Sequence, residues 1–182
     1  RLTEAGYVYI GMDHFALPDD ELALAQQRGS LHRNFMGYTT HADSDLIGLG
    51  VSAIAHIGST FSQNPRDMPG WQNALDEGRL PVFRGMRLSE DDRLRADLIQ
   101  QLMCQAEIPI AALERRYGID FDAYFADDLE RMRPLQDDGL VFKARERILV
   151  TARGRMLLRN IAMCFDRYLH RPSESPRFSR AI

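Results

Sequence analysis

The side chains with the widest chemical repertoire lie near the start of the sequence, in the segment NFMGYTTHADSDLIGLGVSAI, which covers residues 34–54. Its first half carries a Tyr-Thr-Thr run, two aspartates and a histidine, so hydroxyl donors, carboxylates and an imidazole are close in sequence. A nucleophile beside a base, a set of metal ligands and a glycine-rich phosphate loop are all missing from this segment. Residue types alone therefore leave its purpose open.

Two further groups of side chains have functional groups that can take part in binding or catalysis. Asp13 and His14 directly follow a predicted strand, and such a pair can titrate or bind a substrate at the strand ends of a barrel. The alternative, which we favour, is a structural hydrogen bond that orients the next loop. Cys104 and Cys164 are far apart in helix-like surroundings, so they predict buried thiols rather than a disulfide or a metal cluster. No histidine has metal-ligand spacing, so we expect no metal site.

Composition bounds the class of protein. The 182 residues suit one domain or two small ones, and 45% hydrophobic with 27% charged residues is ordinary for a globular chain. The net charge of -3 gives no support for nucleic-acid binding. Apolar stretches fall far short of the roughly 18 residues of a membrane span, and no signal peptide is visible. We therefore expect a cytoplasmic protein that does not bind a membrane.

The first half predicts alternating strands and helices. It opens on RLTEAGYVYIGMDHF, which reads like the end of a helix, a glycine stop and a strand, and it has no initiator methionine. This opening predicts a C-terminal piece of a longer protein. The expected elements are a strand over 7–12, a helix over 18–29, a loop, one or two buried strands within 46–58, a helix over 65–78 and a strand over 81–88.

The sequence pattern changes at Ser89, where mainly helical segments begin. Ser89 and Asp92 form a capping-box pattern, and Leu94, Leu98 and Leu102 then follow the period of an α-helix. Later segments predict helices over 108–118 and 121–135, two strands between 139 and 154, and a helix over 153–169. We therefore predict an α/β (α+β) fold with two domains, residues 1–88 and a small, mainly helical, winged-helix-like domain over residues 89–182.

The winged-helix pattern raises the hypothesis of a DNA-binding regulator. The segment from Ser89 to His170 is slightly acidic, and its candidate recognition helix carries Asp122, Asp127, Asp128 and Glu130. A phosphate backbone would repel this helix. Nucleic-acid binding is therefore the weaker alternative, and a helical domain packed on an α/β domain is the better account.

Several strings together resemble one family. HRNFMGYTTHADSDLIGLGVSAI, preceded by GYVYIGMDHFALPDDELALAQ and followed by DGLVF, VTARGRMLLRNIAMCFDRYL and FSRAI, resembles the oxygen-independent coproporphyrinogen III oxidases. These are radical S-adenosyl-L-methionine enzymes of haem biosynthesis. The resemblance covers nearly the whole chain, and its most specific string is Arg-Asn-Phe-x-Gly-Tyr-Thr-Thr. It implies that residues 1–88 are the last strands and helices of a partial (β/α) barrel.

The resemblance also implies a reaction. The family holds a 4Fe-4S cluster on a Cys-x3-Cys-x2-Cys motif, and a 5′-deoxyadenosyl radical made from S-adenosyl-L-methionine attacks coproporphyrinogen III. Two propionates lose carbon dioxide and become vinyl groups, which gives protoporphyrinogen IX and passes electrons to an unknown acceptor. This chain lacks the three-cysteine motif. We therefore expect it to be inactive alone, with the cluster held by residues absent from it, and we expect a monomer.

Three residues map onto the family's cofactor contacts, namely Phe35, Met36 and Ile54. The resemblance implies that Phe35 packs on the adenine or ribose and that Ile54 forms an apolar wall. Met36 stands where the familiar member has glutamine, so a side-chain amide is lost while a backbone contact can survive. The alternative for Phe35 and Ile54 is plain core packing.

The implied substrate is a tetracarboxylate, and carboxylates favour arginine partners. Arg33 in the motif loop is the best candidate, followed by Arg159 and Arg180. The respective alternatives are a surface ion pair, a solvated helix face and a disordered tail. Tyr38, Thr39 and Thr40 supply hydroxyl donors for the substrate or the cofactor, or else satisfy backbone groups of a local turn.

One alternative keeps the fold without the reaction. In it, the chain is a short paralogue that binds porphyrin or haem and performs no radical chemistry. A native start codon just before Arg1 would favour this hypothesis over the enzyme portion.

Overall fold

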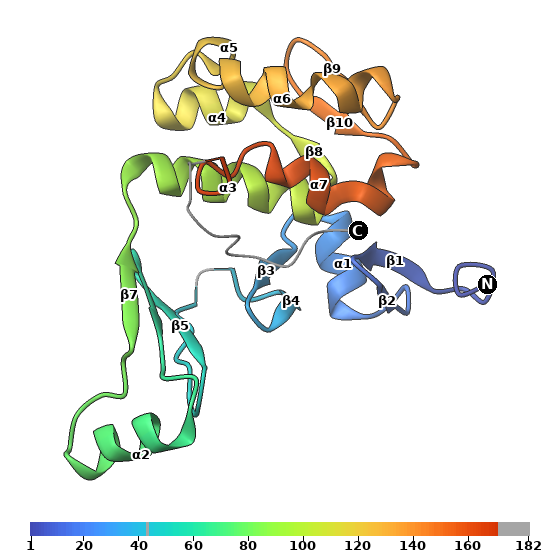
Figure 1. The fold of residues 1–182 in the computed structure, drawn as a ribbon. Coiled ribbons are helices and arrows are strands. Elements are labelled where there is room, and N and C mark those ends of the chain that lie inside the picture. The colour runs from blue at the N-terminus through green and yellow to red at the C-terminus, as the bar shows by residue number, and fades with distance from the viewer. Residues whose placement is uncertain (43, 171–182) are drawn as a thin grey trace.

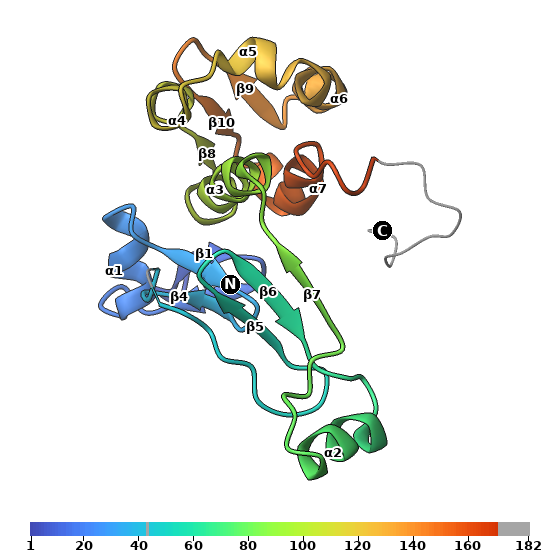
Figure 2. The ribbon, with the colours of Figure 1, turned by 90° about the vertical axis from the view of Figure 1, so that its left-hand side faces the viewer.

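The computed structural model describes residues 1–42 and 44–170 (Figures 1 and 2). Asp43 and the terminal FSRAI motif, residues 178–182, lie outside the described residues. The chain forms three blocks: an N-terminal block of two hairpins and a helix, an arm made of a three-stranded sheet, and a helical C-terminal block.

The N-terminal block confirms one sequence expectation and corrects another. The strand expected over 7–12 is present as Val8–Gly11 and forms the first strand of a hairpin, because Met12 and Asp13 adopt positive φ angles of 41° and 69° and turn the chain back. The polar half of the 34–54 segment was expected to be a loop, yet it begins as a second hairpin. The elements are β1 (Val8–Gly11), β2 (His14–Ala16), α1 (Glu21–Gln27), β3 (His32–Asn34) and β4 (Gly37–Thr39).

The arm projects from the rest of the molecule and ends in a helix (Figures 1 and 2). The prediction of buried strands within 46–58 is wrong, because the strand there is half-buried over residues 54–56 and exposed at Ile57. The strand expected over 81–88 is present at Arg84–Arg87, and all its residues are exposed. No regular strand precedes Ile54 in the 46–58 segment, where Leu46 makes one isolated bridge to His56. The elements are β5 (Ile54–Ile57), β6 (Thr60–Gln63), α2 (Met68–Asp76) and β7 (Arg84–Arg87).

The C-terminal block matches the expected order of elements but divides two expected helices. The capping box is present, since the Ser89 hydroxyl accepts from the Asp92 backbone and the Asp92 carboxylate accepts from the Ser89 backbone. The helix expected over 121–135 breaks at Phe125, and the one over 153–169 is a 3₁₀ turn and a short helix. The elements are α3 (Glu90–Gln105), β8 (Glu107–Ile108), α4 (Ile110–Tyr117), α5 (Phe121–Tyr124), α6 (Ala126–Asp137), β9 (Val141–Lys143), β10 (Ile148–Val150), η1 (Gly154–Leu157) and α7 (Leu158–Met163).

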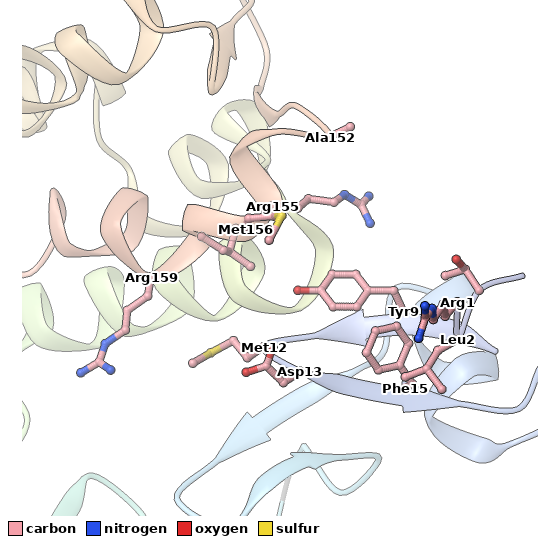
Figure 3. A pocket seen from close by; sticks show the side chains of 12 residues that line it. Arg1, Leu2, Tyr9, Met12, Asp13, Phe15, Ala152, Arg155, Met156 and Arg159 are labelled. Atoms are coloured by element: carbon pink, nitrogen blue, oxygen red, sulfur yellow. The ribbon is translucent and has the colours of Figure 1, made fainter. Parts of the chain in front are cut away.

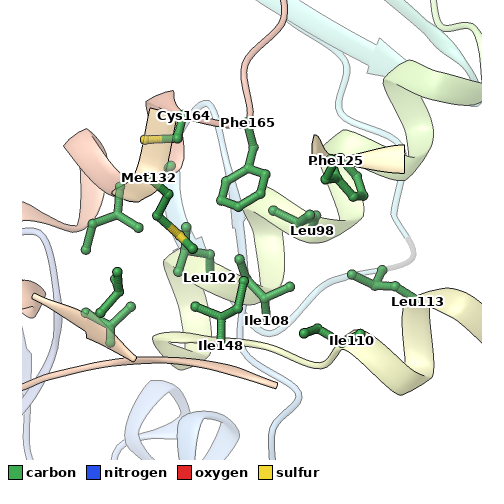
Figure 4. Packing of buried hydrophobic residues seen from close by; sticks show 14 of the residues in the cluster. Leu98, Leu102, Ile108, Ile110, Leu113, Phe125, Met132, Ile148, Cys164 and Phe165 are labelled. Atoms are coloured by element: carbon green, nitrogen blue, oxygen red, sulfur yellow. The ribbon is translucent and has the colours of Figure 1, made fainter. Parts of the chain in front are cut away.

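The main hydrophobic core lies inside the C-terminal block (Figure 4). The leucine stripe of α3 packs there against Phe125, Met132 and Phe165, all of which are fully buried. A smaller core in the N-terminal block includes Ile10 and Leu31, and it is completed by Cys104 from α3. Helix α3 therefore contributes to both cores.

The fold is a mixed α/β arrangement, as the sequence predicts. Every strand ladder among the described residues is antiparallel, and the sheets have two or three strands each. The partial barrel and the winged-helix detail stay predictions. No helix in the described part of the chain is long and apolar enough to cross a membrane.

A buried carboxylate joins the helices of the C-terminal block. Asp128 is 2% exposed and accepts from Arg95 at 2.9 Å and from Arg131 at 2.8 Å. The Arg95 guanidinium also donates to the Phe165 carbonyl at 2.9 Å and pairs with Asp91 at 3.0 Å. Burial alone would raise the pKa of Asp91, but its hydrogen bonds and these charges lower it overall.

We expect Asp128→Asn to lower the free energy of unfolding by about 2 kcal/mol, because it removes a charge partner from buried Arg95 while Asp91 still compensates it. Asp127→Asn is the matched control, since Asp127 is exposed on the same helix. Urea unfolding of the three proteins measures the difference. Equal stabilities would show that the network contributes nothing.

Candidate binding site at the motif hairpin

The β3–β4 hairpin presents its turn to solvent. Its register pairs Arg33 with Tyr38 and Asn34 with Gly37, so Phe35 and Met36 form the turn. The Asn34 side chain stabilises the turn by accepting from the Met36 backbone at 2.8 Å. The Phe35 and Met36 side chains are 58% and 83% exposed. Two of the three predicted cofactor contacts are therefore available to a ligand, and core packing does not explain them.

Helix α3 holds the base of this hairpin. The Tyr38 hydroxyl donates to the Met103 carbonyl at 3.1 Å, and burial raises the pKa of Tyr38 to about 12. The Gln100 amide, in the orientation that satisfies both its groups, donates to the Arg33 carbonyl at 3.1 Å and accepts from His32 at 2.9 Å. The hairpin is thus fixed at both strands while its turn stays free.

One of the predicted hydroxyl donors has a local partner. The Thr39 hydroxyl accepts from the His41 backbone at 3.1 Å, which fits the local-turn alternative for Thr39. The Tyr38 hydroxyl instead reaches the Met103 carbonyl in α3, which is distant in sequence. Thr40 is half-buried and follows the end of β4. A substrate role for the three residues stays a prediction.

A cavity of about 770 Å³, the motif cavity, lies beside the hairpin between residues 41–42 and 44–46, the β5–β6 strands and helices α3 and α4. Arg33 and Phe35 line it from the hairpin, and Arg93 and Arg116 line it from the helices. Arg116 already pairs with Asp97 at 2.8 Å. Within the described part of the chain, the buried Arg33 Nε has no hydrogen-bond partner. The cavity therefore offers an unsatisfied donor beside exposed aromatic surface.

An aromatic path leads from the hairpin to the arm. The Phe35 and Phe61 rings meet edge to face at 5.6 Å, and His56 stacks on Phe61 at 4.1 Å. Because alternate strand residues share a face, Ile54 lies on the same face of β5 as His56. Ile54, however, does not line the motif cavity, so the structure does not place it on the wall that Phe35 shares with Phe61 and His56.

Two further predicted side chains lie outside the motif cavity, namely Met36 and His14. Met36 does not line this cavity. His14 bonds to the Met12 carbonyl at 2.9 Å, which agrees with the structural role favoured for the Asp13–His14 pair. Sequence reasoning missed Phe61 and Arg93, because no element was predicted over residues 59–64 and only the leucine period of the helix that carries Arg93 was interpreted.

The cysteines do not form a metal site. Burial raises the pKa of Cys104 to about 12 and also raises that of Cys164. Both are free thiols, and no group of three or more potential metal ligands exists among the described residues. These residues do not fit an iron–sulfur cluster, which needs several converging thiolates.

The C-terminal block is similar to a known protein family. Residues 88–157 match the family model of the HemN C-terminal domain. Over its whole length the chain is 50% identical to the oxygen-independent coproporphyrinogen III oxidase of Salmonella typhimurium and 53% identical to that of Pseudomonas aeruginosa. It covers 40% and 39% of these two relatives, so it spans about two fifths of their length.

A solved structure agrees. The coproporphyrinogen III oxidase HemN from Escherichia coli, a radical SAM enzyme, superposes with a TM-score of 0.89 at 49% identity. The match covers 92% of this chain and 39% of that one. Over its whole length the chain is therefore similar to the C-terminal portion of oxygen-independent coproporphyrinogen III oxidases, which confirms the resemblance seen in the sequence.

We expect neither thiol to react with an aromatic disulfide reagent at pH 8 while the chain is folded, because burial disfavours both thiolates. Both should react in urea. The absorbance of the thiolate that the reagent releases measures how many cysteines have reacted. Rapid reaction of the folded chain would contradict the burial of these residues.

The packing of Tyr38 at the base of the motif hairpin gives a second test. A Cβ at Gly11 would collide with the Tyr38 hydroxyl, and Gly11 has a φ of 146°, which favours glycine. Gly11→Ala should therefore lower the free energy of unfolding by roughly 1–3 kcal/mol. In the Tyr38→Phe background the same change should cost less, since the hydroxyl is gone. Thermal or urea unfolding of the four proteins closes the cycle, and strict additivity would exclude the collision.

Proposed function

We propose that this chain is the C-terminal part of an enzyme that oxidatively decarboxylates two propionates of coproporphyrinogen III to vinyl groups, giving protoporphyrinogen IX. The observation that carries the proposal is the similarity over the whole chain at about 50% identity, which includes the motif hairpin. Each conversion releases carbon dioxide and passes electrons to an acceptor that the proposal leaves unnamed. The chain itself is inactive in this proposal, because its described residues do not fit the cluster.

The motif hairpin would contribute one wall of an S-adenosyl-L-methionine site. Exposed Phe35 fits a role in stacking on the adenine, and Ile54 would extend the apolar wall outside the motif cavity. Met36 would contribute through its backbone. When bound, S-adenosyl-L-methionine supplies the power to abstract a hydrogen atom. The chain's own residues position the ligand and exclude water around it.

Arg33 would bind a propionate carboxylate. Its Nε is buried and has no partner among the described residues, while its guanidinium lies 5.7 Å from the Tyr38 ring. A carboxylate in the motif cavity would pair with this guanidinium, which lines the cavity. Tyr38 would hold the hairpin, because its hydroxyl already donates to the Met103 carbonyl. Thr39 and Thr40 would donate their hydroxyl groups to the substrate.

We also propose two units, residues 1–88 and 89–182. Support comes from the main core, whose buried members lie between Leu94 and Phe165. A cytoplasmic location is consistent with the two free thiols. A monomeric state follows from the sequence prediction alone.

The proposed reaction is tested on the native polypeptide that contains these residues, purified without oxygen. Incubation with S-adenosyl-L-methionine, a reductant and coproporphyrinogen III should yield protoporphyrinogen IX, measured by chromatography after oxidation. A polypeptide without bound iron and without product would reject the enzyme and favour the porphyrin-binding paralogue.

Within that polypeptide we expect Phe35→Ala to raise the KM for S-adenosyl-L-methionine by about tenfold, because a base–aromatic stack contributes roughly 1–3 kcal/mol. Phe142→Ala is the matched control, since Phe142 is an exposed aromatic residue on β9, away from the motif cavity. Met36→Gln should retain activity. An unchanged KM for Phe35→Ala would remove this residue from the cofactor site.

A further inference from the structure

A second cavity, the arginine cavity, lies between the β1–β2 hairpin and the η1–α7 segment (Figure 3). Its volume of about 710 Å³ falls within the roughly 300–1,000 Å³ of small-molecule sites. None of its lining residues belongs to the motif cavity. The two halves of the chain therefore enclose a space separate from the motif cavity.

The middle of the arginine cavity is apolar and aromatic. The Tyr9 and Phe15 rings lie 5.3 Å apart on one side. Met12 lies beside them, and Met156, which is 88% exposed, comes from the opposite side (Figure 3). Methionine side chains adapt to irregular ligands and pack well against aromatic rings. This lining suits a flat, apolar molecule.

Positively charged side chains lie at two ends of the arginine cavity. Figure 3 shows the guanidinium groups of Arg155 and Arg159 extending to opposite sides of Met156. Neither group forms an ion pair or a side-chain hydrogen bond within residues 1–42 and 44–170. Arg1 adds a third cation to the lining, and Asp13 is the one acid among the described lining residues. The cavity thus carries an excess of positive charge that has no protein partner there.

The backbone is strained at the edge of this cavity. Met12 and Asp13 both have positive φ, a conformation that residues with a side chain rarely adopt. Such strain gathers at ligand sites. The turn places the Asp13 carboxylate beneath the apolar middle (Figure 3), where it can accept hydrogen bonds from N–H groups of a ligand.

We propose that the arginine cavity binds an apolar ring molecule with at least two carboxylates on opposite edges, held by Arg155 and Arg159. Separated cations select separated anions, so the clustered phosphates of a nucleotide fit poorly. The positive sulfonium of S-adenosyl-L-methionine is repelled. The choice of a tetrapyrrole as the ring rests on the proposed function, whereas the anion chemistry follows from the residues.

The test uses coproporphyrin III, an oxidised porphyrin with four carboxylates that cannot be turned over. Fluorescence titration of the 182-residue chain gives a Kd. Arg155→Gln and Arg159→Gln should each weaken binding roughly threefold to fivefold, and the double variant about tenfold or more. Because both side chains are exposed, the variants should fold, which circular dichroism checks. Raising the salt concentration should weaken wild-type binding.

Arg153→Gln is the matched control, since Arg153 is exposed next to η1 and lines neither cavity. Unchanged affinity for this control, with loss in the double variant, supports the site. Equal losses in all variants, no binding, or loss only on Arg33→Gln would overturn it. The readout is binding without turnover, so a failed enzyme assay and a failed titration are separate results.

Discussion

Helix α3 packs on two sides at once, and the positions of both cavities depend on this. One face carries Leu94, Leu98 and Leu102 into the main core, while Cys104 at its end completes the core of the N-terminal block. The helix must therefore keep one rotation about its axis, since a turned helix would expose one set of apolar side chains. Its capping box fixes the residue at which the helix begins, and therefore the direction in which each of its side chains points.

The two hairpins are fixed relative to the C-terminal block through this helix. The Tyr38 hydroxyl reaches the Met103 carbonyl, and the Gln100 amide holds β3. With its base fixed, the motif hairpin can leave the Phe35–Met36 turn exposed without losing order. An exposed aromatic residue on a fixed hairpin loses little entropy on binding, which favours a ligand contact over packing.

Local signals in the sequence were sufficient where the structure is local. The α3 cap needs only Ser89 and Asp92, and it is confirmed. The β3–β4 hairpin was missed because its turn is Phe35–Met36, without the Asn-Gly signature of two-residue turns. The break at Phe125 was missed because it depends on burial of that ring beside Phe121 and Phe165, which only tertiary packing decides.

The sites were less predictable than the elements, because each joins residues distant in sequence. Arg33 and Phe35 were identified from the motif, but Arg93 reaches the same cavity only through the packing of α3. Arg159 was considered for its charge alone, and its position opposite Met12 needs the fold. The two cavities then differ in chemistry: aromatic rings dominate one wall of the first, and separated cations flank the second. Arg116 in the first cavity is already paired with Asp97, whereas Arg155 and Arg159 in the second have no ion-pair partner among the described residues, so the second cavity carries more unpaired positive charge.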